Sequence, residues 1–187
     1  MNYHNILCVG DSQTFGARTY GCYPLHLASI LTEKSPYEWR AVNYSVNGHT
    51  ARDLWFMLNQ ILDGVDDTCQ ACVLIGANDA GEGKDPALFE EYYRQVLRAF
   101  FVKRYKAVYC GEIPPIRPDG HVYFDRGTAD RREMLNQVIS KVVSEYPGAR
   151  LVRFGELGAD FFEDPVHFNE AGNRRVAEAF AEEILER

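Results

Sequence analysis

Four short polar clusters contain the side chains of this chain that could take part in catalysis. They are Gly10-Asp11-Ser12-Gln13, Asn47-Gly48-His49-Thr50, Gly76-Ala77-Asn78-Asp79 and Asp164-Pro165-Val166-His167. A serine hydroxyl is a weak nucleophile until a base removes its proton, and a neutral imidazole suits that role. Ser12 and His167 could therefore act as nucleophile and base. Asp164, three residues before the histidine, could hold the imidazole tautomer and stabilise the imidazolium.

Acyl transfer by such a serine also requires hydrogen-bond donors for the oxygen that becomes negative in the transition state. The clusters offer three candidates: the backbone N–H of Ser12, the backbone N–H of Gly48 and the side-chain amide of Asn78. A glycine suits this role because it has no Cβ to obstruct a close approach of the backbone.

Each cluster also has a simpler interpretation. Gly10 to Ser12 and Gly48 could be ordinary turns, Asn78-Asp79 could be a loop that caps a helix, and Asp164 could be a turn residue. These simpler interpretations would have to hold at four places at once, so the combination favours a catalytic site. For His49 we favour an indirect or exposed position beside that site.

Apolar strands alternate with amphipathic helices along the chain, and this pattern predicts how the clusters are brought together. The predicted strands are Asn5–Gly10, Arg40–Val46, Ala71–Ile75, Ala107–Cys110 and Arg150–Phe154. The predicted helices are Tyr23–Glu33, Ala51–Leu62, Pro86–Lys103, 128–145 and one that Asn169 caps. This order predicts a three-layer α/β/α sandwich with a five-stranded parallel sheet and flavodoxin-like connectivity. The carboxyl ends of its strands share one edge, where the four clusters would meet.

The composition predicts one domain over residues 1–187, since no linker, repeat or low-complexity segment interrupts the pattern. The net charge of −7 argues against nucleic-acid and anionic-membrane partners. No basic flank with a long apolar stretch follows Met1, and no segment approaches the roughly 20 apolar residues of a membrane span. For a chain that starts at Met1 we therefore expect a cytoplasmic location. The sequence leaves the oligomeric state open.

The five cysteines include one C-x-x-C pair, Cys69 and Cys72. A metal site would need two further ligands and a redox motif would open a helix, whereas this pair leads into a predicted strand. We therefore interpret these cysteines as buried or incidental thiols, and we predict neither a metal nor a cofactor.

The four clusters together resemble the blocks of the SGNH/GDSL hydrolase family, and the resemblance extends along the whole chain. Val9-Gly10-Asp11-Ser12 resembles the nucleophile block, and the segment from Asn43 to Thr50 resembles the block whose glycine is an oxyanion donor. Val73 to Asp79 is similar to the G-x-N-D block, and Asp164 to His167 is similar to the D-x-x-H block. One departure is Gln13, where the name-giving motif has leucine.

This resemblance implies the SGNH hydrolase fold and a metal-independent esterase, lipase, thioesterase, deacetylase or acyltransferase. It implies a triad of Ser12, Asp164 and His167, and an oxyanion hole formed by Ser12, Gly48 and Asn78.

The predicted substrate is a small-molecule ester, and the segments after the third and fourth predicted strands are expected to form walls of its pocket. Ala80–Lys84 is short, polar and glycine-rich, and the loop of residues 112–127 mixes Tyr123 and Phe124 with charged side chains such as Arg117. Short acyl groups, acetyl above all, on a polar or carbohydrate-like alcohol fit these walls best. We expect the substrate pocket to include Asp11, His49, Tyr123 and Phe124, although a solvated loop would also explain the charges.

Two alternatives stay open at this point. An acyltransferase would use the same triad but pass the acyl group to an alcohol. A non-catalytic flavodoxin-like module would bind a nucleotide or peptidyl partner, although the chain lacks the phosphate-binding motif G-x-x-x-x-G-K-[ST].

Overall fold

The computed structural model describes residues 3–64, 68–118, 125 and 127–186, and a parallel five-stranded sheet lies at its centre. The strands are β1 (Tyr3–Gly10), β2 (Glu38–Ser45), β3 (Thr68–Leu74), β4 (Ala107–Gly111) and β5 (Ala149–Val152). Their spatial order, β2-β1-β3-β4-β5, is that of flavodoxin-like sheets, so the predicted fold class and connectivity are confirmed.

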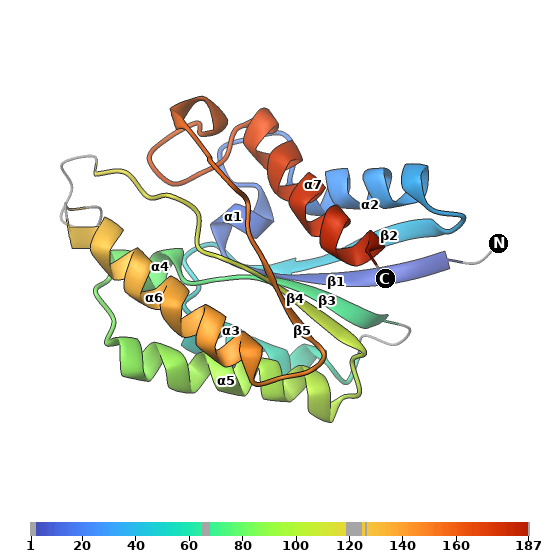
Figure 1. The fold of residues 1–187 in the computed structure, drawn as a ribbon, viewed down its shortest axis with the longest axis horizontal. Coiled ribbons are helices and arrows are strands. Elements are labelled where there is room, and N and C mark those ends of the chain that lie inside the picture. The colour runs from blue at the N-terminus through green and yellow to red at the C-terminus, as the bar shows by residue number, and fades with distance from the viewer. Residues whose placement is uncertain (1–2, 65–67, 119–124, 126, 187) are drawn as a thin grey trace.

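Helices cover both faces of this sheet, which gives the three predicted layers (Figure 1). One face packs against α2 (Tyr23–Lys34) and α7 (Glu170–Leu185). The other face packs against α3 (Ala51–Ile61), α5 (Pro86–Val102) and α6 (Gly127–Ser144).

Burial on both faces explains why the inner strand β1 is apolar from Ile6 to Val9. In β1, Leu7 and Val9 belong to the core under α3, α5 and α6, whereas Ile6 and Cys8 belong to the core under α2 and α7. Each fully buried aliphatic side chain of this size contributes roughly 1.5–3 kcal/mol of hydrophobic stabilisation. The sheet therefore forms a rigid platform for the loops at its carboxyl edge.

Three short elements are absent from the sequence-based prediction: α1 (Ser12–Phe15), α4 (Ala77–Gly81) and the 3₁₀ turn η2 (Ala159–Phe161). Each is at most five residues long, which is too short to show a helical apolar period. Two of them matter for the site, because α1 begins at Ser12 and α4 contains Asn78.

The cysteines that the structure describes fully agree with the interpretation as buried thiols. Cys8, Cys22, Cys72 and Cys110 are buried and unpaired in disulfides. Burial raises the pKa of Cys72 well above its ordinary value, and the neighbouring Cys8 adds to this effect. Cys72 is therefore a neutral core residue.

Candidate active site

All four clusters contribute residues to one open cavity at the carboxyl edge of the sheet. The cavity has a volume of about 590 Å³. Its walls contain Ser12, Phe15, Gly16, Ala17, Arg18, Thr19, Asn47, Gly48, Asn78 and His167. The topology thus brings together side chains that lie up to 155 positions apart in the sequence, as the parallel sheet predicts.

The connection between β1 and α1 is the single residue Asp11, and this tight turn places Ser12 in the wall of the cavity. Gly10 allows the turn, because a Cβ at this position would collide with the Leu74 carbonyl oxygen and the Thr14 hydroxyl. Asp11 then caps α1 by accepting a hydrogen bond of 2.9 Å from the backbone N–H of Gln13.

Ser12, His167 and Asp164 form a continuous chain of hydrogen bonds. His167 Nε2 lies 2.9 Å from Ser12 Oγ, and His167 Nδ1 lies 2.7 Å from Asp164 Oδ2. Partial burial raises the pKa of Asp164, but hydrogen bonds from the backbone N–H and imidazole of His167 and from the Val166 N–H outweigh this and bring its pKa below the ordinary value. The carboxylate therefore stays ionised, as is needed to stabilise an imidazolium.

The segment that carries Asp164 and His167 is fixed by donors from two other parts of the chain. Arg117 donates from Nη2 to the Asp164 carbonyl oxygen (3.2 Å) and from its backbone N–H to the Pro165 carbonyl oxygen (3.1 Å). Gln13 Nε2 donates to the Val166 carbonyl oxygen at 2.8 Å. Sequence reasoning missed both roles, since no local pattern connects Arg117 or Gln13 with a segment so far along the chain.

The three candidate oxyanion donors all line the cavity. Gly48 adopts a left-handed conformation, with φ of +80°, and in the described part of the chain neither its N–H nor that of Ser12 has a hydrogen-bond partner. Asn78 Nδ2 donates to the His49 carbonyl oxygen at 2.8 Å and makes a longer contact of 3.4 Å with Asp11 Oδ2. The arrangement can thus offer two backbone donors and one side-chain amide.

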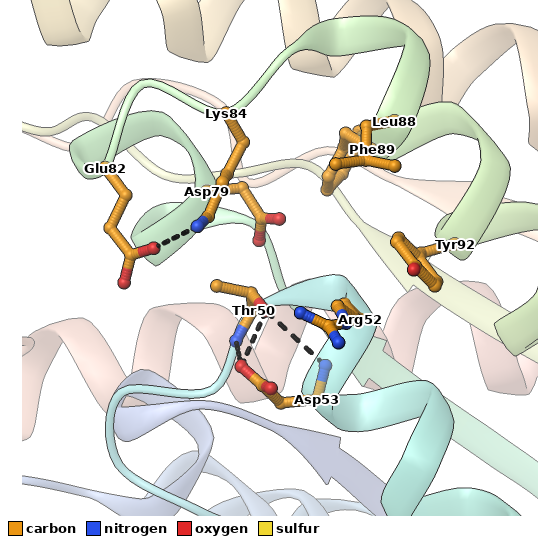
Figure 2. Close-up of a pocket in the computed structure, with 9 residues that line it drawn as sticks. All are labelled: Thr50, Arg52, Asp53, Asp79, Glu82, Lys84, Leu88, Phe89 and Tyr92. Atoms are coloured by element: carbon orange, nitrogen blue, oxygen red, sulfur yellow. Dashed lines mark hydrogen bonds and ion pairs between the residues drawn. The ribbon is translucent and has the colours of Figure 1, made fainter.

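A buried carboxyl group, Asp79, joins the two segments that carry these donors. Its Oδ2 accepts a hydrogen bond of 3.0 Å from the backbone N–H of Ala51, the first residue of α3. Figure 2 shows Asp79 facing the start of α3, where Thr50 and Asp53 form a capping box, beside a second cavity of about 130 Å³. The start of α4 is therefore tied to the start of α3.

Burial also raises the pKa of Asp79 to about 7 and makes stability depend on pH. A carboxyl group with a raised folded-state pKa contributes stability that is complete below its unfolded-state pKa of about 3.9. That contribution is lost as the pH rises through about 7. Asp79→Asn cannot ionise but keeps an oxygen for the Ala51 N–H, so it should raise the free energy of unfolding more at pH 8 than at pH 5. The difference should be at most about 3 kcal/mol.

Urea unfolding of wild type and variant at the two pH values measures this difference. Asp130→Asn, which removes an exposed carboxylate from α6, is the matched control. Equal effects of Asp79→Asn at pH 5 and pH 8 would contradict the assignment.

Four residues are expected from the sequence to line the substrate pocket: Asp11, His49, Tyr123 and Phe124. Asp11 is fully buried and is not one of the residues that line the cavity. Burial raises the pKa of Asp11 to about 7. The hydrogen bond from the Gln13 N–H lowers this pKa, and the nearby Asp79 carboxyl group raises it further. His49 is half-buried, and its carbonyl group supports Asn78. Tyr123 and Phe124 lie outside the described residues.

Two further properties concern only the part of the chain that the structure describes. It contains no group of three or more His, Cys, Asp or Glu side chains that could hold a metal ion. None of its helices is long and apolar enough to cross a membrane.

Comparisons with known proteins agree with this fold. The model of the GDSL-like lipase/acylhydrolase family matches residues 8–175. An inhibitor-bound aryl esterase from M. smegmatis has the same fold, with a TM-score of 0.84 at 18% identity over 98% of this chain and 99% of that one. A carbohydrate acetylesterase from Sinorhizobium meliloti has a TM-score of 0.84 at 14% identity, with the same coverage. A lipase/acylhydrolase from Enterococcus faecalis has a TM-score of 0.80 at 19% identity over 98% of this chain and 96% of that one. No curated protein matches the sequence significantly.

Proposed function

The chain belongs to the GDSL-like lipase/acylhydrolase family, and from this premise we propose that it is a serine esterase that hydrolyses carboxylic esters through an acyl-enzyme. One observation carries the proposal: the hydrogen-bonded chain from Ser12 Oγ through His167 to Asp164, with contacts of 2.9 Å and 2.7 Å. Nucleophile, base and orienting carboxylate are thus within reach of one another without any rearrangement.

In the proposed reaction Ser12 Oγ attacks the ester carbonyl carbon while His167 Nε2 takes the hydroxyl proton. Asp164 keeps the imidazole in place and stabilises its positive charge. The carbonyl oxygen becomes negative and accepts hydrogen bonds from the N–H groups of Ser12 and Gly48 and from the Asn78 amide. His167 then gives its proton to the leaving alcohol, and a water molecule that His167 deprotonates releases the acid and restores Ser12.

The Asn78 amide has two hydrogens, and its contacts fit this role. The His49 carbonyl oxygen takes one of them at 2.8 Å, which fixes the orientation of the amide plane. The second contact, to Asp11 Oδ2, is long at 3.4 Å, so exchanging it for a shorter bond to an oxyanion would cost little. In this proposal one hydrogen of the Asn78 amide holds the side chain in place, and the other donates to the oxyanion.

The cavity walls support a substrate with a short acyl group and a polar or carbohydrate-like alcohol. Among the described residues that line it, Phe15 is the one large apolar side chain and Arg18 the one permanently charged group. Gly16, Ala17, Thr19 and Asn47 are small or polar, and the cavity is open to solvent. A long acyl chain would need a broad apolar groove instead.

A series of p-nitrophenyl esters from acetate to decanoate tests both the esterase activity and this preference. We expect hydrolysis of the acetate, and a kcat/KM that is highest among the shortest acyl chains, because the described walls offer little apolar surface to further methylenes. The leaving group is the same throughout, so differences report on the acyl side alone. A kcat/KM that climbs through decanoate would contradict the preference, since each buried methylene would then add up to about 0.8 kcal/mol of binding. Absence of hydrolysis throughout the series, and of carbohydrate acetates, would contradict the esterase activity.

A further inference from the structure

Gln13, the residue that follows Ser12, is buried. Its side chain connects the turn that carries Ser12 with residues 164–167, which we call the histidine's segment. The residue is 2% exposed, and its side-chain Nε2 donates to the Val166 carbonyl oxygen at 2.8 Å. Its own backbone N–H is held by Asp11 Oδ1 at 2.9 Å. Gln13 is thus fixed at its backbone and again at the end of its side chain.

The acceptor of this bond belongs to the peptide group immediately before His167. That peptide group carries the Val166 carbonyl oxygen on one side and the His167 N–H on the other, and it is planar. Gln13 holds the oxygen, and Asp164 Oδ1 accepts from the His167 N–H at 2.8 Å. With both polar groups fixed, the plane from which the imidazole projects has a defined position relative to Ser12.

We propose that Gln13 is a positioning residue, which through its hydrogen bond to Val166 sets the separation between Ser12 Oγ and His167 Nε2. The proposal rests on the esterase function proposed above. Proton transfer from the hydroxyl requires a separation of about 2.6–3.2 Å, and a displacement of about 1 Å can cost on the order of a hundredfold in rate. The leucine of the name-giving motif could fill the same space but could not donate this bond.

Gln13→Leu tests the proposal against Gln70→Leu as a matched control. Gln70 is a partly buried glutamine near the amino-terminal end of β3, where its side chain accepts from the Tyr109 hydroxyl at 3.2 Å. Both variants lose one amide that makes a hydrogen bond, but only Gln13 touches the histidine's segment. Gln13→Leu should lower kcat by about tenfold to a hundredfold with little change in KM, whereas Gln70→Leu should keep wild-type kcat.

Two readouts separate positioning from general destabilisation. The second-order rate of fluorophosphonate labelling of Ser12 should fall in parallel with kcat, since both need the base in place. The low-field proton NMR signal of the bond between His167 Nδ1 and Asp164 should be kept in Gln70→Leu and be shifted or broadened in Gln13→Leu. Gln13→Met, which has similar length and no donor, should behave in the same way and replaces the leucine variant if that variant does not fold.

A folded Gln13→Leu or Gln13→Met protein with wild-type kcat, labelling rate and imidazole signal would overturn the proposal. If wild type itself hydrolyses no ester, the proposed function fails, but the NMR signal still tests whether Gln13 places His167. The two failures are thereby distinguishable.

Discussion

Ser12→Ala should reduce kcat by roughly 10⁴–10⁶ while the free energy of unfolding stays close to that of wild type. The loss follows from the removal of the one hydroxyl that lies 2.9 Å from the imidazole of His167. The fold should tolerate the change because alanine is well suited to a helical position and the site is only partly buried. Initial rates with p-nitrophenyl acetate, together with urea unfolding, measure the two quantities.

Ser144→Ala is a suitable control for this result. Ser144 ends α6 on the surface, where its hydroxyl donates to the Lys141 carbonyl oxygen, so this variant should keep wild-type kcat. A well-folded Ser12→Ala protein that retains kcat within tenfold of wild type would exclude Ser12 as the nucleophile.

Asn78→Ala should lower kcat by roughly 10²–10³ and leave KM nearly unchanged. An oxyanion donor contributes mainly in the transition state, when the carbonyl oxygen becomes negative, and much less to the bound ester. The variant also leaves the His49 carbonyl oxygen without the 2.8 Å bond from Asn78, so its stability has to be measured together with its kinetics.

Asn59→Ala provides the matched comparison for Asn78→Ala. Asn59 also donates from its side-chain amide to a backbone carbonyl oxygen, that of Trp55 at 3.0 Å, but it lies on the exposed side of α3. This variant should retain wild-type kinetics. If Asn78→Ala instead raises KM alone, Asn78 binds the substrate or supports the loop and is not an oxyanion donor.

The layers and the meeting of the four clusters could be predicted from the sequence because each depends on a local pattern. Apolar strands such as Asn5–Gly10 and helices such as Pro86–Lys103 have enough residues to show their period, and a parallel sheet places all strand ends with the same direction at one edge. The helices α1 and α4 could not be predicted in this way, since four or five residues show no period.

The contacts that fix the candidate site depend on side chains distant in sequence, which is why they could not be predicted. The bond from Gln13 to Val166 spans 153 positions, and that from Arg117 to Asp164 spans 47. The burial of Asp11, adjacent to Ser12, likewise depends on how β1 and β3 pack and not on the residues beside it. Residue types indicated which groups could react, but only the packed fold shows what holds them.

The most direct test of an activated Ser12 is the site of covalent labelling by a fluorophosphonate, identified by mass spectrometry of the intact chain and of its peptides. Of the serines in this chain, only one with a base such as His167 at hydrogen-bond distance should react at an appreciable rate. We expect one phosphonyl group per chain, located on the peptide that contains Ser12, and no labelling of Ser12→Ala. Labelling of a different residue, or no labelling of the folded wild-type protein, would contradict the account.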